Sequence, residues 1–552
     1  MRLTRSAIRS LATIIAIAIS VAPAPAQVDN SQAPPIPSGP FRIAGTLVNS
    51  KNGSPLARAR VTIASVQNRQ STQSLVTEEG GRFEFRVPAG KYSLVAAKRG
   101  FITTAYDQHD QYSTAIVTGP GLDSEHLTFR MGPNAVLSGR VLDEVGEPVR
   151  NAQIMVYREN HFQGVSRIFP VRGATTDDQG YYEATPLDEG TYFVSAKASP
   201  WYTTAPNVAA NGGKQLPSQI DPSLDVAYPI TYYGDATEAE DATPIPVRGG
   251  DHLEADIHVT PVPSLHLIVH IPEDPEHGVS LPVLQKSAFD GTEQVETSHL
   301  QRIGAGEYEL TGVPAGRYTV RMPGASGEMK EPAEVNLTSG GELDMSSGNP
   351  TARMRVTVQM EGASSLPRQL QIGLRNLKGR VTASQVDEKG EANFADVIAG
   401  RYELVAGAAG QPLSVVKMSS ETGTVSGHTL SVPPGSALNL SITLVGGSVT
   451  IEGFAKRGDK GTAGAMIVLV PKNPEANRDR FRRDQSDFDG SFSLPHVIPG
   501  SYTIVAIENG WDLDWATAAT LAKYLEHGQR LFVDGRSPKI MHLPSAVEVE
   551  IK

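Results

Sequence analysis

Two short motifs contain residue types that can catalyse hydrolysis. The first is His270-Ile-Pro-Glu273, because a His-x-x-Glu pair supplies two ligands of a hydrolytic zinc site and leaves a metal position for water. A proline lies inside the motif, the flanking residues have the pattern of a strand and a turn, and the segment is too short for a large α/β catalytic domain. We therefore favour a strand end with exposed polar side chains. His266 shares the strand face of His270, which predicts a half-exposed sheet edge.

The second motif is Ser414-Val-Val-Lys417, which matches the Ser-x-x-Lys pattern of serine nucleophiles activated by lysine. That chemistry needs the two side chains one helical turn apart. The motif lies in a β-rich segment, where this spacing puts the side chains on opposite faces. Neither motif therefore predicts a catalytic residue.

Acidic residues gather before two glycines, Gly180 and Gly490. Carboxylates bind Ca²⁺, but neither cluster has the spacing of a complete calcium loop that ends in a bidentate Glu. Side chains that accept hydrogen bonds from their own turn are the favoured interpretation. The sequence thus predicts no metal and no cofactor. The clusters are Asp177 with Asp178, and Asp484 with Asp487 and Asp489.

One region is rich in aromatic side chains, although these residues make up only 6% of the chain. Exposed rings on a loop stack on sugars or anchor a protein partner, so these residues are candidates for ligand binding. The alternative, which we favour, is that they fix a long insertion onto its own domain. The residues are Trp201, Tyr202, Tyr228, Tyr232 and Tyr233.

The elements that position these residues follow from an internal repeat. A Gly-x-Tyr tripeptide followed by alternating apolar residues occurs five times, and each copy has another glycine ten residues upstream. Apolar residues spaced two apart lie between the glycines, so each copy predicts turn, strand, turn, strand. The repeated pairs are Gly90 and Tyr92, Gly190 and Tyr192, Gly316 and Tyr318, Gly400 and Tyr402, and Gly500 and Tyr502.

The tyrosine of each copy is expected to point inward. Its ring is large enough to fill the space between two sheets, and its hydroxyl needs a backbone partner, as in the tyrosine corner of other sandwiches. The recurring residues then serve packing and turns.

The chain, at 552 residues, is too long for one compact core. The five repeats predict an all-β tandem array of about five β-sandwiches, with at most a short helix in the last one. That helix is expected from Trp515 to Glu526, with Asp514 as its cap and Gly528 at its end. The expected divisions are 41–132, 133–262 with the aromatic insertion, 263–348, 349–446 and 447–552.

Residues 1–26 have the features of a secretory signal: an arginine-rich start, an apolar run and small residues before an expected cleavage after Ala26. The apolar run is too short for a membrane anchor, so no membrane span is expected after cleavage. Residues 27–40 are rich in proline and predict a stiff linker. The protein is thus expected to be secreted or periplasmic.

Composition excludes several classes of protein. No cysteine is present, which excludes a disulfide scaffold, a thiolate nucleophile and a thiolate zinc site. The net charge of −11 gives no basic patch, so nucleic acid is excluded as a partner.

The repeat resembles a known domain family. In the second copy the relevant residues are Gly139-Arg-Val141, Gly146-Glu-Pro148, Ala152-Gln-Ile154 and Gly190-Thr-Tyr192. This pattern is similar to the carboxypeptidase regulatory-like domain, a transthyretin-like β-sandwich allied to starch-binding-like and collagen-adhesin modules. The resemblance is good in the first, second and fifth copies and partial in the others. It implies a non-catalytic domain, which in carboxypeptidases accompanies a separate zinc domain.

These observations predict a non-catalytic interaction or structural scaffold, with a glycan or an envelope protein as partner. Carbohydrate binding through a starch-binding-like sandwich is the alternative function, and hydrolysis by a carboxypeptidase-type enzyme is a lesser one.

Overall fold

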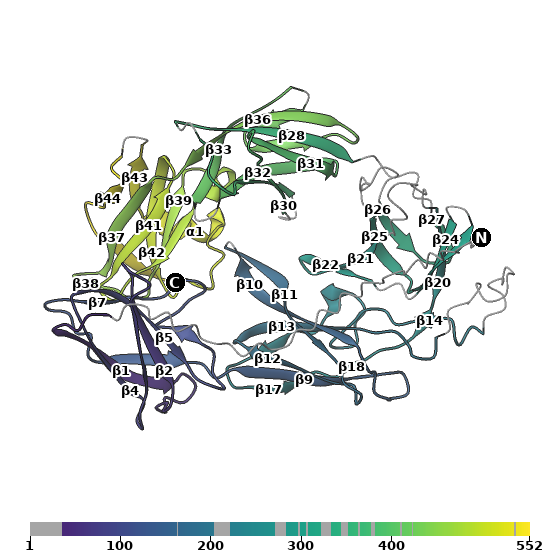
Figure 1. Ribbon diagram of the computed structural model, residues 1–552, viewed down its shortest axis with the longest axis horizontal. Coiled ribbons are helices and arrows are strands. Elements are labelled where there is room, and N and C mark those ends of the chain that lie inside the picture. The colour runs from purple at the N-terminus through teal and green to yellow at the C-terminus, as the bar shows by residue number, and fades with distance from the viewer. Residues whose placement is uncertain are drawn as a thin grey trace, which may run out of the picture.

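The computed structural model is built almost entirely of β-strands (Figure 1). The predicted signal, most of the predicted linker and Glu273 lie outside the described residues. Within the described part, no helix is long and apolar enough to span a membrane. The structure describes residues 36–552 without 163, 204–220, 271–282, 296–298, 305–306, 322–332, 344–350, 363–364, 377–380, 409–410, 422 and 535–536.

The strands form five units that share one topology. The first long strand of each unit pairs antiparallel with the strand that follows the upstream repeat glycine, and parallel with the last strands of the unit. The Gly-x-Tyr strand pairs antiparallel with an earlier strand in the second layer. We number the units 1 to 5, and their strands span 41–131, 135–258, 265–343, 352–446 and 449–551.

Unit 1 shows how alternation builds the sandwich. In β4 (Arg82–Val87) Phe83, Phe85 and Val87 are buried, and the residues between them are exposed. They meet Tyr92 and Leu94 of β5 (Gly90–Ala97) in one core between the sheets β4-β1-β8 and β3-β2-β5. The other strands are β1 (Phe41–Asn49), β2 (Arg60–Ser65), β3 (Thr72–Val76), β6 (Thr104–Ala105), β7 (Ile116–Thr118) and β8 (Leu127–Met131).

Unit 2 repeats this plan with longer strands. Its layers are β12-β9-β17, joined by β18, and β11-β10-β13-β15, joined by β16. Two further short strands, β14 and β19, pair with each other beside it. The strands are β9 (Ala135–Leu142), β10 (Gln153–Phe162), β11 (Val165–Thr175), β12 (Tyr181–Leu187), β13 (Gly190–Lys197), β14 (Val226–Ala227), β15 (Thr231–Tyr232), β16 (Ile245–Val247), β17 (His252–Glu254), β18 (Ile257–His258) and β19 (Val262–Pro263).

Unit 3 consists of the sheets β23-β24-β20-β27 and β22-β21-β25-β26. Its core cluster also takes in Tyr157, Ile230 and Tyr232 of unit 2, so the two units share buried apolar surface. The strands are β20 (Leu265–His270), β21 (Val283–Ala288), β22 (Gly291–Gln294), β23 (His299–Gly304), β24 (Glu307–Val313), β25 (Gly316–Arg321), β26 (Ala333–Leu337) and β27 (Gly341–Leu343).

In unit 4 one strand joins the two layers. Strand β33 (Gln411–Ser420) pairs with β32 (Gly400–Ala408) and with β36 (Ala437–Gly446), and its register shifts between Val415 and Lys417. The other strands are β28 (Ala352–Met360), β29 (Gln371–Asn376), β30 (Val381–Gln385), β31 (Glu391–Val397), β34 (Thr424–Ser426) and β35 (Thr429–Val432).

In unit 5 the joining strand is the last one, β45 (Val547–Ile551), which pairs with β37 (Val449–Arg457) and with β42 (Gly500–Glu508). The other strands are β38 (Lys460–Gly461), β39 (Met466–Pro471), β40 (Arg482–Gln485), β41 (Ser491–Val497), β43 (Gln529–Val533) and β44 (Ile540–His542). All six residues of β39 are buried, because they contact the unit 5 core on one side and a second cluster that contains the helix on the other.

The helix in unit 5 is shorter than the sequence predicts. Helix α1 spans Ala518–Leu525, and its N-cap is Thr517 rather than Asp514. The carboxylate of Asp514 instead accepts a hydrogen bond from the backbone N–H of Ser166 in unit 2, at 2.8 Å. The side chain of Asp514 therefore forms a contact between units 2 and 5 instead of capping the helix.

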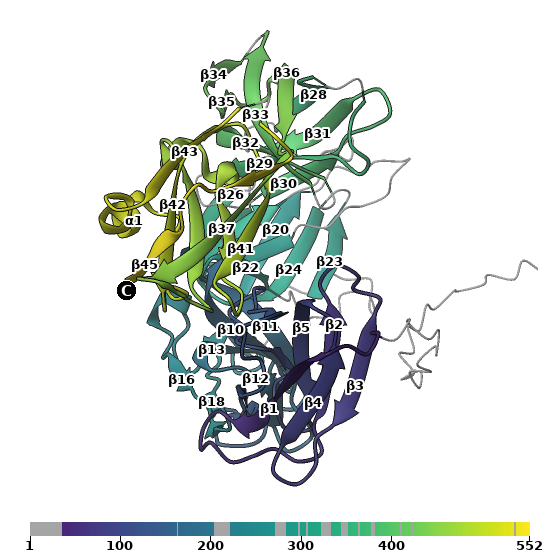
Figure 2. The ribbon, with the colours of Figure 1, turned by 90° about the vertical axis from the view of Figure 1, so that its left-hand side faces the viewer.

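The five units follow a curved path that brings the last unit back to the first. In Figure 1 the chain passes through units 1, 2, 3 and 4 in turn, and the yellow unit 5 lies beside the purple unit 1. Figure 2, turned by 90°, shows unit 5 above unit 1, with α1 on the outer side. Hydrogen bonds between Lys91 and Asp487, and between His109 and Gln485, join the two units.

Candidate functional site

The five repeat tyrosines occupy equivalent positions. Each ring lies in or against the core of its unit, and each hydroxyl donates to the backbone carbonyl four residues earlier. The donor–acceptor distances are 3.2 Å for Tyr92, 2.9 Å for Tyr192, 2.6 Å for Tyr318, 2.9 Å for Tyr402 and 2.6 Å for Tyr502. The ring thus packs in or against the core, and the hydroxyl satisfies a backbone carbonyl. Burial raises the pKa of Tyr502 to about 12, so this group stays protonated in neutral solution.

The repeat glycine lies close to the tyrosine ring in units 1, 3, 4 and 5, whereas Gly190 of unit 2 lies close to Arg158. A Cβ at Gly316 or Gly500 would lie 3.4 Å from the ring or hydroxyl of the tyrosine two residues later. A side chain would make ordinary van der Waals contact at this distance, so space alone does not require glycine there. Gly190 and Gly400 instead have positive φ angles of 156° and 155°, which favour glycine.

The aromatic residues of the unit 2 insertion do not form one exposed cluster. Tyr232 is fully buried where units 2 and 3 meet, and Tyr233 packs against the unit 2 core. The hydroxyls of Tyr202 and Tyr228 both donate to the carboxylate of Glu144, which fixes the insertion to its own domain. Trp201 differs, because its side chain is 83% exposed and meets Tyr202 edge to face at 5.8 Å. Of the five candidates, Trp201 is thus the one that presents its ring to solvent.

Two side chains in or beside the motifs of catalytic residue types, His266 and Ser414, form structural contacts. His266 lies between two carboxylates, with Nδ1 2.9 Å from Glu309 and Nε2 2.9 Å from Asp225. Burial lowers the pKa of His266, but hydrogen bonds to Glu309 and Asp225 outweigh this and raise the pKa above its usual value. His266 is partly exposed, as predicted, but β20 is an inner strand of its sheet rather than an edge, and the side chain forms a partly buried ionic contact. Ser414 is buried and accepts a hydrogen bond from Arg480 at 3.3 Å, a contact between units 4 and 5.

The aspartate three residues before the upstream repeat glycine has two different roles. In units 2 and 4, Asp177 and Asp387 each accept hydrogen bonds from two backbone N–H groups of their own turn. In unit 5, Asp487 instead accepts from Lys91 at 2.7 Å and from the backbone N–H of Ala115 at 3.0 Å, both in unit 1. A turn position of the repeat has thus become a link between distant units.

Asp484 is partly buried beside this link. Its carboxylate accepts a hydrogen bond from the backbone N–H of Ser493 at 2.8 Å. Burial raises its pKa to about 6, although that hydrogen bond acts in the opposite direction. The local turn capping predicted for the cluster holds for Asp489, which accepts from the backbone N–H of Ser491.

A buried arginine completes the contact between units 1 and 5. The side chain of Arg483 is 7% exposed and forms an ion pair with Asp110 of unit 1 at 2.9 Å. Its guanidinium carbon lies 4.9 Å from the ring centre of Tyr112, 5.4 Å from Trp511 and 4.7 Å from Trp515. These aromatic faces stabilise the charge in place of water. Trp511 also stacks on His109 of unit 1 at 5.0 Å.

Sequence reasoning did not find this interface. Lys91, Asp110 and Arg483 belong to no local motif, because their partners are hundreds of residues away. The scarcity of tryptophan was the available signal, since two of the three tryptophans in the chain lie at this contact.

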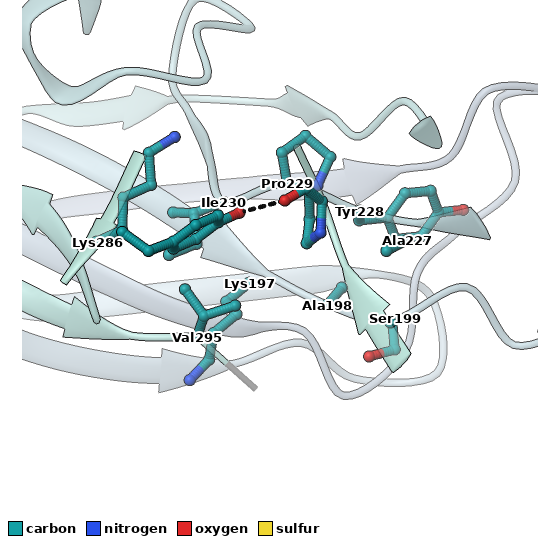
Figure 3. A pocket seen from close by; sticks show the side chains of 12 residues that line it. Lys197, Ala198, Ser199, Ala227, Tyr228, Pro229, Ile230, Lys286 and Val295 are labelled. Atoms are coloured by element: carbon teal, nitrogen blue, oxygen red, sulfur yellow. Dashed lines mark hydrogen bonds between the residues drawn. The ribbon is translucent and has the colours of Figure 1, made fainter. Parts of the chain in front are cut away.

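Units 2 and 3 meet through the hairpin β21–β22. Phe289, at its tip, has a positive φ of 50° and packs against the rings of Tyr157, Phe193 and Tyr232, with centroids 4.8–5.7 Å away. Asp290 accepts a hydrogen bond from the backbone N–H of Ile168 at 2.7 Å. A small cavity of about 20 Å³ lies nearby, and Figure 3 shows that its lining includes Lys197 and Tyr228 of unit 2 and Lys286 of unit 3. A larger cavity, of about 230 Å³, lies at the same interface.

Among the described residues, no group of three or more His, Asp or Glu side chains is placed to hold a metal ion.

The model of one domain family matches the first two units. Residues 42–131 and 136–224 match the carboxypeptidase regulatory-like domain. The chain carries two tandem carboxypeptidase regulatory-like domains. These domains correspond to units 1 and 2, and units 3 to 5 repeat their strand pairing. No curated protein matches the chain significantly.

Several solved structures match the chain at low sequence identity and low TM-score. The Bacillus anthracis TIE protein is 10% identical, with a TM-score of 0.18, over 93% of this chain and 73% of that one. The minor pilin GBS52 of Streptococcus agalactiae is 12% identical, with a TM-score of 0.21, over 41% of this chain and 97% of that one. The major pilin BcpA of Bacillus cereus is 8% identical, with a TM-score of 0.14, over 74% of this chain and 99% of that one. At these TM-scores the similarity gives no information on function.

Proposed function

We propose that this protein is a non-catalytic scaffold, secreted or periplasmic, that holds five β-sandwich units in a fixed curved arrangement for interaction with an envelope partner. The observation that carries this proposal is the change of role at the repeat aspartate. Asp177 and Asp387 stabilise their own turns, whereas Asp487 binds Lys91 and Ala115 of unit 1.

Two further features support a scaffold. The repeat tyrosines pack in the cores, so the residues that the units have in common stabilise the fold. The contacts between units are formed by largely buried side chains, Arg483 at one interface and Tyr157 at another. Buried contacts of this kind fix the relative orientation of domains better than exposed polar ones do.

The proposal is tested by site-specific photo-cross-linking in the native envelope, with the cross-linker at exposed positions of each unit. We expect capture of one defined partner by the wild-type protein and reduced capture by Arg483→Ala, which removes the buried ion pair between units 1 and 5. Arg478→Ala is the matched control, because Arg478 forms an exposed ion pair within unit 5. Equal capture by wild type and Arg483→Ala would contradict the role of the fixed arrangement. Peptidase or esterase activity of the purified protein would contradict the non-catalytic assignment.

Carbohydrate binding is a second candidate function, and Trp201 is the observation that favours it. Its ring is 83% exposed, and its neighbour Tyr202 is bound to Glu144, which gives a rigid aromatic face of the kind that stacks on sugars. Polysaccharide pull-down should then retain the wild-type protein and lose Trp201→Ala. Tyr181→Ala, which removes another exposed ring of the same unit, is the control and should bind normally.

A further inference from the structure

A cavity of about 230 Å³ lies where unit 3 packs on the outer face of unit 2. Strands β10 and β13 form one wall, and the hairpin β21–β22 forms the other. Met155, Tyr157 and Ala288 supply apolar surface, while Ser195, Lys197 and Glu293 supply polar groups. A single water molecule needs only about 10–15 Å³ of such space, so the cavity admits a small organic molecule.

Glu293 is the group that gives this cavity its chemistry. Its Oε1 accepts a hydrogen bond of 2.9 Å from the hydroxyl of Ser195, whose residue is only 1% exposed. Burial raises the pKa of Glu293 to about 7. The hydrogen-bond partner of the Glu293 carboxylate, within the described part of the chain, is this Ser195 hydroxyl and not a cation. The ionised carboxylate has lost water without gaining a counter-charge.

The charged neighbours of Glu293 are bound elsewhere. Lys286 lies opposite Glu293 in the hairpin register, but its ammonium group donates to the carboxylate of Glu238 at 2.9 Å and to the carbonyl of Thr237 at 2.6 Å. Lys197, on β13, donates to the backbone carbonyl of Gln294 at 3.4 Å. On β10 the titratable neighbour is Tyr157, which is neutral in its protonated form. A cation that enters the cavity therefore finds an acceptor in Glu293.

We propose that this cavity binds a small primary amine with an apolar body, whose ammonium group pairs with Glu293 and whose body contacts Met155, Tyr157 and Ala288. A neutral polyol would add hydrogen bonds but would leave the partly buried carboxylate without a counter-charge. A carboxylate ligand would place a second negative charge beside Glu293. An ammonium group both satisfies the oxygen atoms and offsets the charge.

The proposal is tested by isothermal titration of the full-length secreted protein with 2-phenylethylamine and cyclohexylmethylamine at pH 8. We expect both amines to bind with one site and the neutral analogue 2-phenylethanol to bind at least tenfold more weakly. Glu293→Gln should weaken the amines about tenfold or more. The matched control is Glu254→Gln, an exposed carboxylate on β17 of unit 2, which should leave both affinities unchanged.

The pH dependence provides an independent measurement. Binding requires ionised Glu293, so the affinity should fall about tenfold for each pH unit below 7, which gives a loss of roughly 30-fold at pH 5.5. Protons should be released on binding at pH 6. Failure of both amines to bind the folded wild-type protein, equal affinity in Glu293→Gln, or equal affinity at pH 5.5 and 8 would each overturn the proposal. None of these results bears on the scaffold, which depends on Lys91, Asp487 and Arg483.

Discussion

At the scale of single residues, the same side chain at the same repeat position performs different tasks according to the donors around it. Asp177 meets two N–H groups of its own turn, as the turn pattern predicts. Asp487 follows the same local pattern, but Lys91 and Ala115 reach it from unit 1. The sequence therefore predicts the position of the carboxylate and its turn, and cannot predict a partner that only the arrangement of the units brings close.

The repeat tyrosine of unit 5 allows a quantitative test. In Tyr502→Phe the buried carbonyl of Ile498 loses its hydrogen bond, so we expect unit 5 to lose about 1 kcal/mol. Tyr502→Ala also leaves a cavity and should cost about 3–5 kcal/mol. Hydrogen exchange of the β42 amides measures both values. Tyr181→Phe, at an exposed site, should leave exchange unchanged, and an equal effect of both Phe variants would contradict a specific role for the Tyr502 hydroxyl.

Asp484 predicts a dependence of stability on pH. Because burial raises its pKa from 3.8 to about 6, ionisation costs stability, and this cost is absent below pH 3.8 and complete above pH 6. Asp484→Asn keeps an oxygen for the Ser493 N–H group and avoids the charge. We expect the variant to be more stable than wild type at pH 8, by up to about 3 kcal/mol, and equally stable near pH 4.

Thermal unfolding at the two pH values measures this difference. Asp512→Asn is the control with the opposite sign, because the hydrogen bond from Lys552 lowers the pKa of Asp512, so its ionised form stabilises the fold. A wild-type protein more stable than Asp484→Asn at pH 8 would contradict the prediction.

At the scale of elements, the repeat spacing predicts the strands and turns, because both depend on residues that are close in sequence. Alternation of apolar residues places Phe83 and Phe85 on one face of β4, and glycine marks the turns. The start of α1 was predicted wrongly, since Asp514 binds Ser166 in another unit. The hairpin β21–β22 also has a contact that the sequence does not predict. Its strands follow from the local pattern, but Phe289 packs against Phe193 of unit 2.

Phe289 should be the anchor between units 2 and 3. Phe289→Ala removes contacts with three aromatic rings, and we expect the interface to lose about 2 kcal/mol or more. Amides of β21 and β22 should then exchange faster while those of β28 stay unchanged. Phe532→Ala is the control, because Phe532 is 64% exposed in unit 5. Unchanged exchange of the hairpin in Phe289→Ala would show that the anchor lies elsewhere.

At the scale of the whole molecule, the contact between units 1 and 5 closes the curved path. The number of repeats and the all-β class follow from sequence, since each unit uses short-range patterns. The relative placement of the units does not, because it depends on side chains such as Arg483 and Trp511 that belong to no repeat.

Removal of the buried arginine should open this closure. Arg483→Ala loses the ion pair with Asp110 and the contacts with three aromatic faces, each desolvated cation–π contact being worth about 2 kcal/mol. Small-angle X-ray scattering should show a larger radius of gyration, and exchange should rise in residues 107–115. Arg478→Ala should give the wild-type curve. An unchanged radius in Arg483→Ala would mean that other contacts suffice to keep the units closed.

The separation of Lys91 and Asp487 by 396 positions has a consequence for biosynthesis. Unit 1 leaves the ribosome well before its partner surface exists, so the surface around Lys91 stays hydrated while the rest of the chain is made. The charge of Lys91 helps to keep this surface in water during that time, although the aromatic ring of Tyr112 lies on the same surface. Docking of unit 5 onto unit 1 therefore requires that translation has reached Asp487.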